Sequence, residues 1–142
     1  MQKADPHILT IFGASGDLAR RKLIPSIFNL YLQDLLPEKF ALLGTGRKKF
    51  TDGSFRDHMR EALETFTVER ADPSSVTAFL EYLHYVSIDT SNPDDYARLT
   101  TKLAELDQRR DTGDNHIFYL ATPPSLYATV AHSLAGQGLA RD

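Results

Sequence analysis

The chain has 142 residues, of which 42% are hydrophobic and 25% are charged, and its formal net charge is −3. These values suit one globular domain with a substantial core, and the charge gives no indication of binding to nucleic acid or to an acidic membrane. The sequence contains no cysteine, which excludes disulfides and thiolate metal sites and is compatible with a cytoplasmic location. No apolar run reaches the roughly 18 residues of a membrane span, and the five histidines are too isolated to predict a metal site.

The first predicted strand is the apolar run 7–12, which is followed at once by a turn of small residues and then by a helix. The turn has the spacing Gly-x-x-Gly-x-x-Ala, formed by Gly13, Gly16 and Ala19. Such a turn can hold a phosphate, because small residues let the backbone approach the anion and the first amides of the helix point toward it. Gly13 would permit the tight turn, Gly16 would leave room for a pyrophosphate, and Ala19 would let the helix pack closely on the strand. An ordinary strand-to-helix turn is the alternative interpretation.

Three cations, Arg20, Arg21 and Lys22, follow in the first turns of this predicted helix. Exposed cations near a helix N-terminus destabilise it by about 0.3–1 kcal/mol each, so their presence favours an anion nearby. The alternative is a solvated basic face that Asp17 partly compensates. Pro25 then interrupts the helical spacing, and we expect it to kink one helix rather than to separate a second segment that begins near Ser26.

The remaining predicted elements alternate along the chain. Strands are expected at 40–45, 85–88 and 117–121, and helices at 55–66, 73–83, 93–106 and 126–136. Alternation of this kind predicts an α/β fold, the N-terminal half of a Rossmann-type doubly wound parallel sheet with strand order 3-2-1-4. The last helix should lead into another strand, so we expect residues 1–142 to form one truncated domain. The strand edge left bare would then lower stability and favour self-association.

The residues after the second strand indicate which dinucleotide would bind. In NAD-binding units an acidic residue there holds the ribose 2′-hydroxyl, whereas an arginine accommodates a 2′-phosphate. Here the strand ends in 44–49, Gly-Thr-Gly-Arg-Lys-Lys, with three cations and no carboxylate. A guanidinium matches the planar geometry of phosphate, so Arg47 is the predicted 2′-phosphate ligand and Lys48 could assist it. The sequence therefore favours NADP, with a solvated basic loop as the alternative.

Three motifs together resemble the N-terminal coenzyme domain of glucose-6-phosphate dehydrogenase. They are Phe-Gly-Ala-Ser-Gly-Asp-Leu-Ala-Arg-Arg-Lys-Leu at 12–23 with Pro25, Gly-Thr-Gly-Arg at 44–47, and Phe-Tyr-Leu-Ala-Thr-Pro-Pro at 118–124. The resemblance runs from about His7 onward. It implies an oxidoreductase that transfers hydride from C1 of glucose 6-phosphate to NADP, giving 6-phosphogluconolactone and NADPH in the pentose phosphate pathway. It also implies a parent protein that is a homo-oligomer through a separate substrate and dimerisation domain.

The resemblance further implies roles for individual residues. The coenzyme phosphate loop would comprise Gly13, Ala14, Ser15, Gly16, Asp17, Leu18, Ala19 and Arg20. Arg47 would contact the 2′-phosphate, Asp89 and Thr90 would border the adenosine, and Tyr119, with Ala121 and Thr122, would lie along the coenzyme toward the nicotinamide. Lys22 would lie near the substrate and help to hold an anionic ligand. The alternatives are a core role for Tyr119, a helix-entry turn for Asp89 and Thr90, and a solvated role for Lys22.

The catalytic parts of the family are expected downstream of this chain. Its Glu-Lys-Pro-Phe-Gly segment and its base histidine have no substitute here, so no catalytic residue is predicted and the chain alone is expected to be inactive. A non-catalytic NADP-sensing module or an atypical short-chain-dehydrogenase-like domain is the competing hypothesis. None of the six tyrosines has a lysine four residues later, which argues against short-chain-dehydrogenase catalysis.

Overall fold

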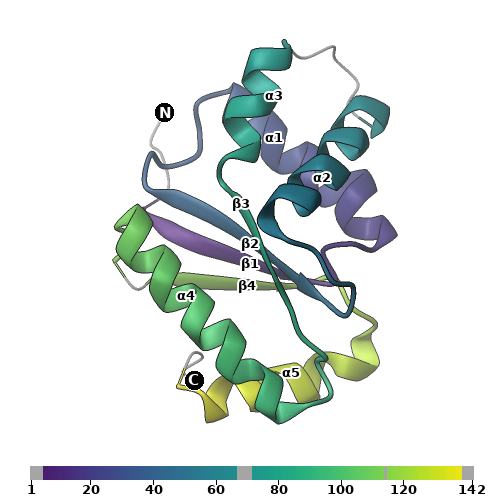
Figure 1. The fold of residues 1–142 in the computed structure, drawn as a ribbon, viewed down its shortest axis with the longest axis vertical. Coiled ribbons are helices and arrows are strands. Elements are labelled where there is room, and N and C mark those ends of the chain that lie inside the picture. The colour runs from purple at the N-terminus through teal and green to yellow at the C-terminus, as the bar shows by residue number, and fades with distance from the viewer. Residues whose placement is uncertain (1–4, 67–71, 114, 139–142) are drawn as a thin grey trace.

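A computed structural model describes residues 5–66, 72–113 and 115–138 (Figure 1). The strands β1 (His7–Phe12), β2 (Phe40–Gly46), β3 (Leu83–Ser87) and β4 (His116–Leu120) form one parallel sheet in the order β3-β2-β1-β4. The predicted strand order is therefore confirmed. The third strand begins at residue 83 and the fourth at 116, earlier than the predicted 85 and 117.

Helices cover both faces of this sheet. Helices α1 (Ile24–Leu32), α2 (Asp52–Phe66) and α3 (Pro73–Leu80) lie on one face, and α4 (Tyr96–Arg110) and α5 (Tyr127–Gly136) lie on the other (Figure 1). This is the doubly wound arrangement that the alternating pattern predicted. In the described part of the chain, no helix combines the length and the apolar character that crossing a membrane requires.

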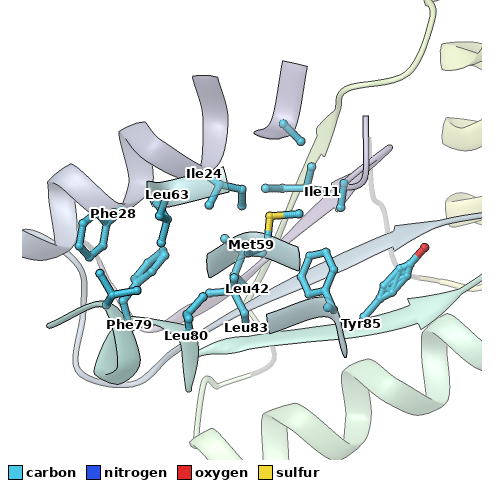
Figure 2. Close-up of a cluster of buried hydrophobic side chains, with 14 of the residues drawn as sticks. Ile11, Ile24, Phe28, Leu42, Met59, Leu63, Phe79, Leu80, Leu83 and Tyr85 are labelled. Atoms are coloured by element: carbon cyan, nitrogen blue, oxygen red, sulfur yellow. The ribbon is translucent and has the colours of Figure 1, made fainter. Parts of the chain in front are cut away.

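Two hydrophobic cores result, one on each face. Along β1, Ile8 and Phe12 pack with α4 and α5, while Ile11 packs with the helices of the opposite face. The core between the sheet and helices α1, α2 and α3 contains Phe28, Met59, Leu63 and Phe79 (Figure 2). Each large side chain that is fully buried stabilises the fold by about 1.5–3 kcal/mol. Alternation of side chains along the strands thus divides the apolar residues between the two layers.

The helix after the first turn accommodates Pro25 without a break. A π-helical turn, Ala19–Leu23, leads directly into α1, and the N–H of Ile24 donates to the carbonyl of Ala19. Leu23 and Ile24 both keep helical backbone angles. Proline has no N–H to donate, and a wider turn just before it lets the chain stay helical. A separate segment that begins near Ser26 is therefore not what forms.

The two edges of the sheet are finished differently. At β3, the N–H of Tyr85 donates to Asp52 at 2.9 Å and the carbonyl of Leu83 accepts from Arg56 at 2.9 Å, so two α2 side chains cap the strand edge. At β4, the other edge, Ile117 is 51% exposed and Tyr119 is 42% exposed. The backbone edge of β3 is therefore capped by side chains, whereas the β4 edge strand carries exposed apolar side chains.

Candidate functional site

The small-residue turn lies at the carboxyl end of β1, where parallel sheets bind their ligands. The N–H groups of Gly13 and Ala14 donate to the carbonyl of Thr45 at 2.9 and 3.2 Å. Gly13 has a φ of +83°, and a Cβ atom there would lie 2.8 Å from the carbonyl oxygen of Ala121. Glycine is therefore required at this position, both by conformation and by the close approach of Ala121, the residue after β4.

The outer side of this turn is open. Gly16 is exposed, and a Cβ atom placed on it would meet, among the described residues, only the carbonyl of Gly13, at 3.3 Å. Asp17 and Leu18 are exposed with helical backbone, whereas Ala19 is fully buried. The first amides of a helix have no acceptor inside it, so this turn presents backbone donors at an accessible helix start. That arrangement fits a phosphate group.

The side chains of the three cations after the turn lie in different environments. Arg20 is half-buried, and its Nε has no hydrogen-bond partner within the described residues. The guanidinium of Arg21 lies 5.2 Å from the ring centre of Phe66 on α2, and Lys22 is exposed. The stacking of Arg21 accounts for one of these charges without an anion. A nearby anion is therefore not needed to explain all three of these cations.

Arg47 follows β2 and lies beside Asp89. Its guanidinium is 3.3 Å from the carboxylate of Asp89, and its side chain is 75% exposed. Hydrogen bonds from Ser91, and then the charge of Arg47, hold the pKa of Asp89 below its usual value. Exposed ion pairs contribute little to stability, so the Arg47 guanidinium can exchange this partner for a ligand at small cost. The sequence assigned both residues to the coenzyme but did not predict that they touch.

Gly46, the last residue of β2, lies between the turn after β1 and the loop that carries Arg47. A Cβ atom there would lie 3.3 Å from the hydroxyl of Tyr85 and 3.9 Å from the hydroxyl of Ser15. The phosphate-loop residue Ser15 and the strand residue Tyr85 therefore approach β2 directly before Arg47. The predicted phosphate and 2′-phosphate ligands are brought to the same end of β1 and β2.

The other predicted coenzyme residues occupy the ends of β3 and β4. The N–H of Asp89 donates to Asp95 at 2.8 Å, and the carbonyl of Thr90, a 7% exposed residue, accepts from the hydroxyl of Tyr96. These contacts form the helix-entry turn that was the alternative for Asp89 and Thr90, although Asp89 also reaches Arg47. Tyr119 is 42% exposed, so it is not a core residue within the described part of the chain. The coenzyme roles of all these residues stay predictions.

Sequence reasoning missed a partly buried polar cluster centred on Asp52 of α2. Asp52 accepts from His84 at 2.8 Å and from Lys102 at 3.3 Å, in addition to the N–H of Tyr85. Burial alone would raise the pKa of Asp52, but its hydrogen bonds with His84 and Tyr85 and the Lys102 charge hold it well below its usual range. Burial lowers the pKa of His84, partly opposed by Asp52. No local sequence signal connects residues 32 and 50 positions apart.

Comparisons with known proteins agree with this geometry. The family model described as glucose-6-phosphate dehydrogenase, NAD binding domain, matches residues 10–142. Glucose-6-phosphate 1-dehydrogenase from Treponema pallidum is 49% identical over 138 residues, which cover 96% of this chain and 27% of the relative. The enzyme from Aggregatibacter actinomycetemcomitans is 41% identical over 140 residues, which cover 99% of this chain and 28% of that relative.

Solved structures give the same answer. A glucose-6-phosphate dehydrogenase in complex with its substrate glucose-6-phosphate superposes with a TM-score of 0.80 at 29% identity, covering 94% of this chain and 28% of that one. The Mycobacterium avium enzyme also gives a TM-score of 0.80, at 28% identity over 94% of this chain and 27% of its own. The chain thus spans little more than a quarter of the length of these proteins. It belongs to the family of glucose-6-phosphate dehydrogenase NAD-binding domains.

Proposed function

We propose that this chain is the coenzyme-binding domain of a glucose-6-phosphate dehydrogenase that uses NADP. Its relatives carry that enzyme name, and the family model names a nicotinamide-coenzyme domain. Because the chain covers only 27% of a relative's length, substrate, oligomeric state and activity belong to this proposal. A cytoplasmic location, the incomplete domain and a homo-oligomeric parent are likewise sequence predictions.

The open turn at residues 13–19 supports a dinucleotide pyrophosphate. Gly16 leaves the outer side of the turn free, and the helix start offers backbone N–H donors together with a positive partial charge. Ser15, Gly16 and Asp17 would line the pyrophosphate, whereas the N–H groups of Gly13 and Ala14 already donate to Thr45. The residues present therefore fit the coenzyme that the family implies.

The position of Arg47 is the observation that carries the preference for NADP. It is an exposed guanidinium at the end of β2, one residue after the glycine that abuts Ser15. A guanidinium can bind a 2′-phosphate through two parallel hydrogen bonds, and Lys48 adds a second positive charge. Asp89, two residues after the end of β3, would border the adenosine ribose.

The bound coenzyme would accept a hydride from C1 of glucose 6-phosphate, and the hydroxyl proton of C1 would pass to a base. This chain would bind and orient the coenzyme, with Tyr119 toward the nicotinamide and Lys22 toward the substrate. It offers no base for that proton among its predicted site residues. Mixing the purified chain with NADP and glucose 6-phosphate should therefore produce no NADPH, and sustained production would contradict this assignment.

Titration of an Arg47→Ala variant tests the coenzyme preference. Removing a guanidinium–phosphate contact costs about 1.5–3 kcal/mol, so the Kd for NADP should rise about 10- to 150-fold while the Kd for NAD hardly changes. The control is Lys39→Ala, which removes an exposed cation that pairs with Asp111 just before β2. Equal losses for NADP and NAD, or no loss for either, would contradict the proposal.

A further inference from the structure

We propose that Tyr85 is a positioning residue for recognition of the 2′-phosphate, because its hydroxyl holds the backbone of the loop that carries Arg47 and Lys48. This inference rests on the proposed function, since it assigns to Arg47 the role given above. Tyr85 itself would not touch the coenzyme. It would act by fixing the direction from which the two cations reach the phosphate.

The geometry of Tyr85 is that of a buried anchor. The residue is 4% exposed, and its hydroxyl donates to the carbonyl of Lys48 at 2.7 Å. Its ring packs against Phe55 at 4.9 Å and Phe50 at 5.0 Å between ring centres. Figure 2 shows Tyr85 at one end of the core cluster, with its oxygen directed away from the other labelled side chains. The ring is thus fixed by the core and the hydroxyl by the loop.

Two further hydrogen bonds join the same loop to the end of β3 and to the residue after it. The N–H of Ile88 donates to the carbonyl of Gly46 at 2.9 Å, and the hydroxyl of Ser87 donates to the carbonyl of Arg47 at a longer 3.4 Å. The hydrogen bond from the Tyr85 hydroxyl to the carbonyl of Lys48, the residue after Arg47, is shorter, at 2.7 Å. Together, these bonds fix the peptide groups on both sides of Arg47, which sets where its side chain leaves the backbone.

The Tyr85 hydroxyl remains a hydrogen-bond donor across the physiological pH range. Burial raises the pKa of this phenol to about 12, so the O–H stays protonated. The Asp52 carboxylate accepts from the Tyr85 N–H at 2.9 Å, which fixes the backbone of the same residue from the side of α2. Tyr85 therefore connects a rigid buried cluster to an exposed basic loop. Holding a binding loop in its bound conformation improves affinity because less freedom is lost on binding.

The Tyr85→Phe variant removes the hydroxyl and keeps the ring. We expect the Kd for NADP to rise about 3- to 10-fold, the effect of losing one hydrogen bond that orders a binding loop, while the Kd for NAD changes less than twofold. The matched control is Tyr31→Phe, since Tyr31 packs on Phe28 and Phe79. Figure 2 shows these two phenylalanines at the opposite end of the core cluster from Tyr85. Calorimetric titration measures each Kd, and thermal unfolding checks that both variants fold.

A double mutant separates positioning from a general loss of packing. If Tyr85 acts through Arg47, the Tyr85→Phe effect on NADP should shrink toward twofold or less in the Arg47→Ala background. Amide exchange of residues 47–50 in the free protein should become faster in Tyr85→Phe and stay unchanged in Tyr31→Phe. An undiminished effect in the Arg47→Ala background, or equal losses for NADP and NAD, would overturn the inference.

The two proposals fail in different ways. A selective loss of NADP binding in Arg47→Ala, with none in Tyr85→Phe, overturns the role of Tyr85 alone. No selective loss in either variant overturns the NADP assignment and the inference with it. A selective loss in Tyr85→Phe but not in Arg47→Ala overturns both the 2′-phosphate role of Arg47 and the action of Tyr85 through it.

Discussion

Single residues at the carboxyl end of β1 have separable tasks. Gly13 is constrained from within, by its positive φ and by the carbonyl of Ala121, whereas Gly16 faces outward. The first glycine therefore serves the fold, and the second is placed to serve a ligand. The sequence already predicts a tight turn at Gly13 and room for a pyrophosphate at Gly16, and the structure adds the contact with Ala121 that constrains Gly13.

Alanine substitutions should separate these two tasks. Gly13→Ala should lower the free energy of unfolding by about 1–3 kcal/mol, because alanine strains at this φ and its Cβ meets a backbone oxygen. Gly16→Ala should change stability by less than about 1 kcal/mol but weaken binding of NADP and NAD alike, since its Cβ enters the space of the pyrophosphate. Denaturant unfolding and coenzyme titration measure the two effects. A Gly13→Ala variant as stable as the wild type, or a Gly16→Ala variant with unchanged affinity for both coenzymes, would contradict these separate roles of the two glycines.

The Asp89 carboxylate contacts Arg47 and therefore lies beside the proposed 2′-phosphate site. Two like charges about 4 Å apart repel by roughly 1 kcal/mol even in water. Asp89→Asn should therefore lower the Kd for NADP about 3- to 10-fold and leave NAD nearly unchanged. Asp94→Asn, an exposed position in the following turn, is the control. If Asp89→Asn instead weakened both coenzymes, the carboxylate would be a ribose ligand rather than a competitor for Arg47.

At the scale of elements, α2 closes the β3 edge of the sheet. Asp52 and Arg56 lie one turn apart on α2, and each caps one outward backbone group of β3. His84 and Lys102 bring β3 and α4 to the same carboxylate. One acidic residue thus connects three elements, so the charge states of this cluster should affect the stability of the whole layer.

The buried histidine predicts a particular dependence of stability on pH. Burial holds the pKa of His84 below its ordinary 6.5, so the unfolded chain takes up the proton first as the pH falls. Stability contributed by neutral His84 should be complete above about pH 6.5 and decline below it. The lowered pKa of Asp52 adds a second loss below about pH 3.8. The charges of Arg56 and Arg110 also lower the pKa of the imidazole, and Lys102 contacts the Asp52 carboxylate.

Thermal unfolding between pH 8 and pH 5 measures this effect. The wild-type melting temperature should fall between pH 6.5 and pH 5, and the His84→Gln variant should be less stable at pH 8 with a flatter profile. His132→Gln, at an exposed position on α5, should keep the wild-type profile. A wild-type melting temperature that rises toward pH 5 would mean that Asp52 outweighs burial and raises the pKa of His84.

Elements were predictable where the pattern is local. The spacing of apolar residues along short segments predicted the strands and most helices. The alternation of these strands and helices along the chain then predicted the strand order of the sheet. The start of β3 was missed because His84 interrupts its apolar run, and its burial depends on Asp52, 32 positions away. The helical path through Pro25 was also ambiguous, since a π-helical turn leaves no distinct spacing. Contacts between distant polar residues, such as Arg47 with Asp89, had no sequence signal.

For the whole molecule, the two sheet edges differ in how well they are covered. The α2 side chains close β3, whereas β4 alternates between half-buried and exposed residues along its length. Leu9 and Ile11 of β1 pair in register with Ile117 and Tyr119, yet Ile11 is buried while the two β4 residues are 51% and 42% exposed. Coverage of that face therefore ends between β1 and β4. An edge strand with exposed apolar side chains is a site for association with another chain.

Concentration-dependent association through β4 is accordingly the expected behaviour of this chain in solution. Sedimentation velocity of the wild type should show dimers or larger species that increase with concentration. Ile117→Lys should shift the distribution toward monomer, because a charge on an edge strand opposes pairing. Leu32→Lys, at a 44% exposed leucine on α1, is the matched control and should leave association unchanged. A monomeric wild type at high concentration would show that this edge does not drive association, and equal effects of both lysines would assign it to general surface hydrophobicity.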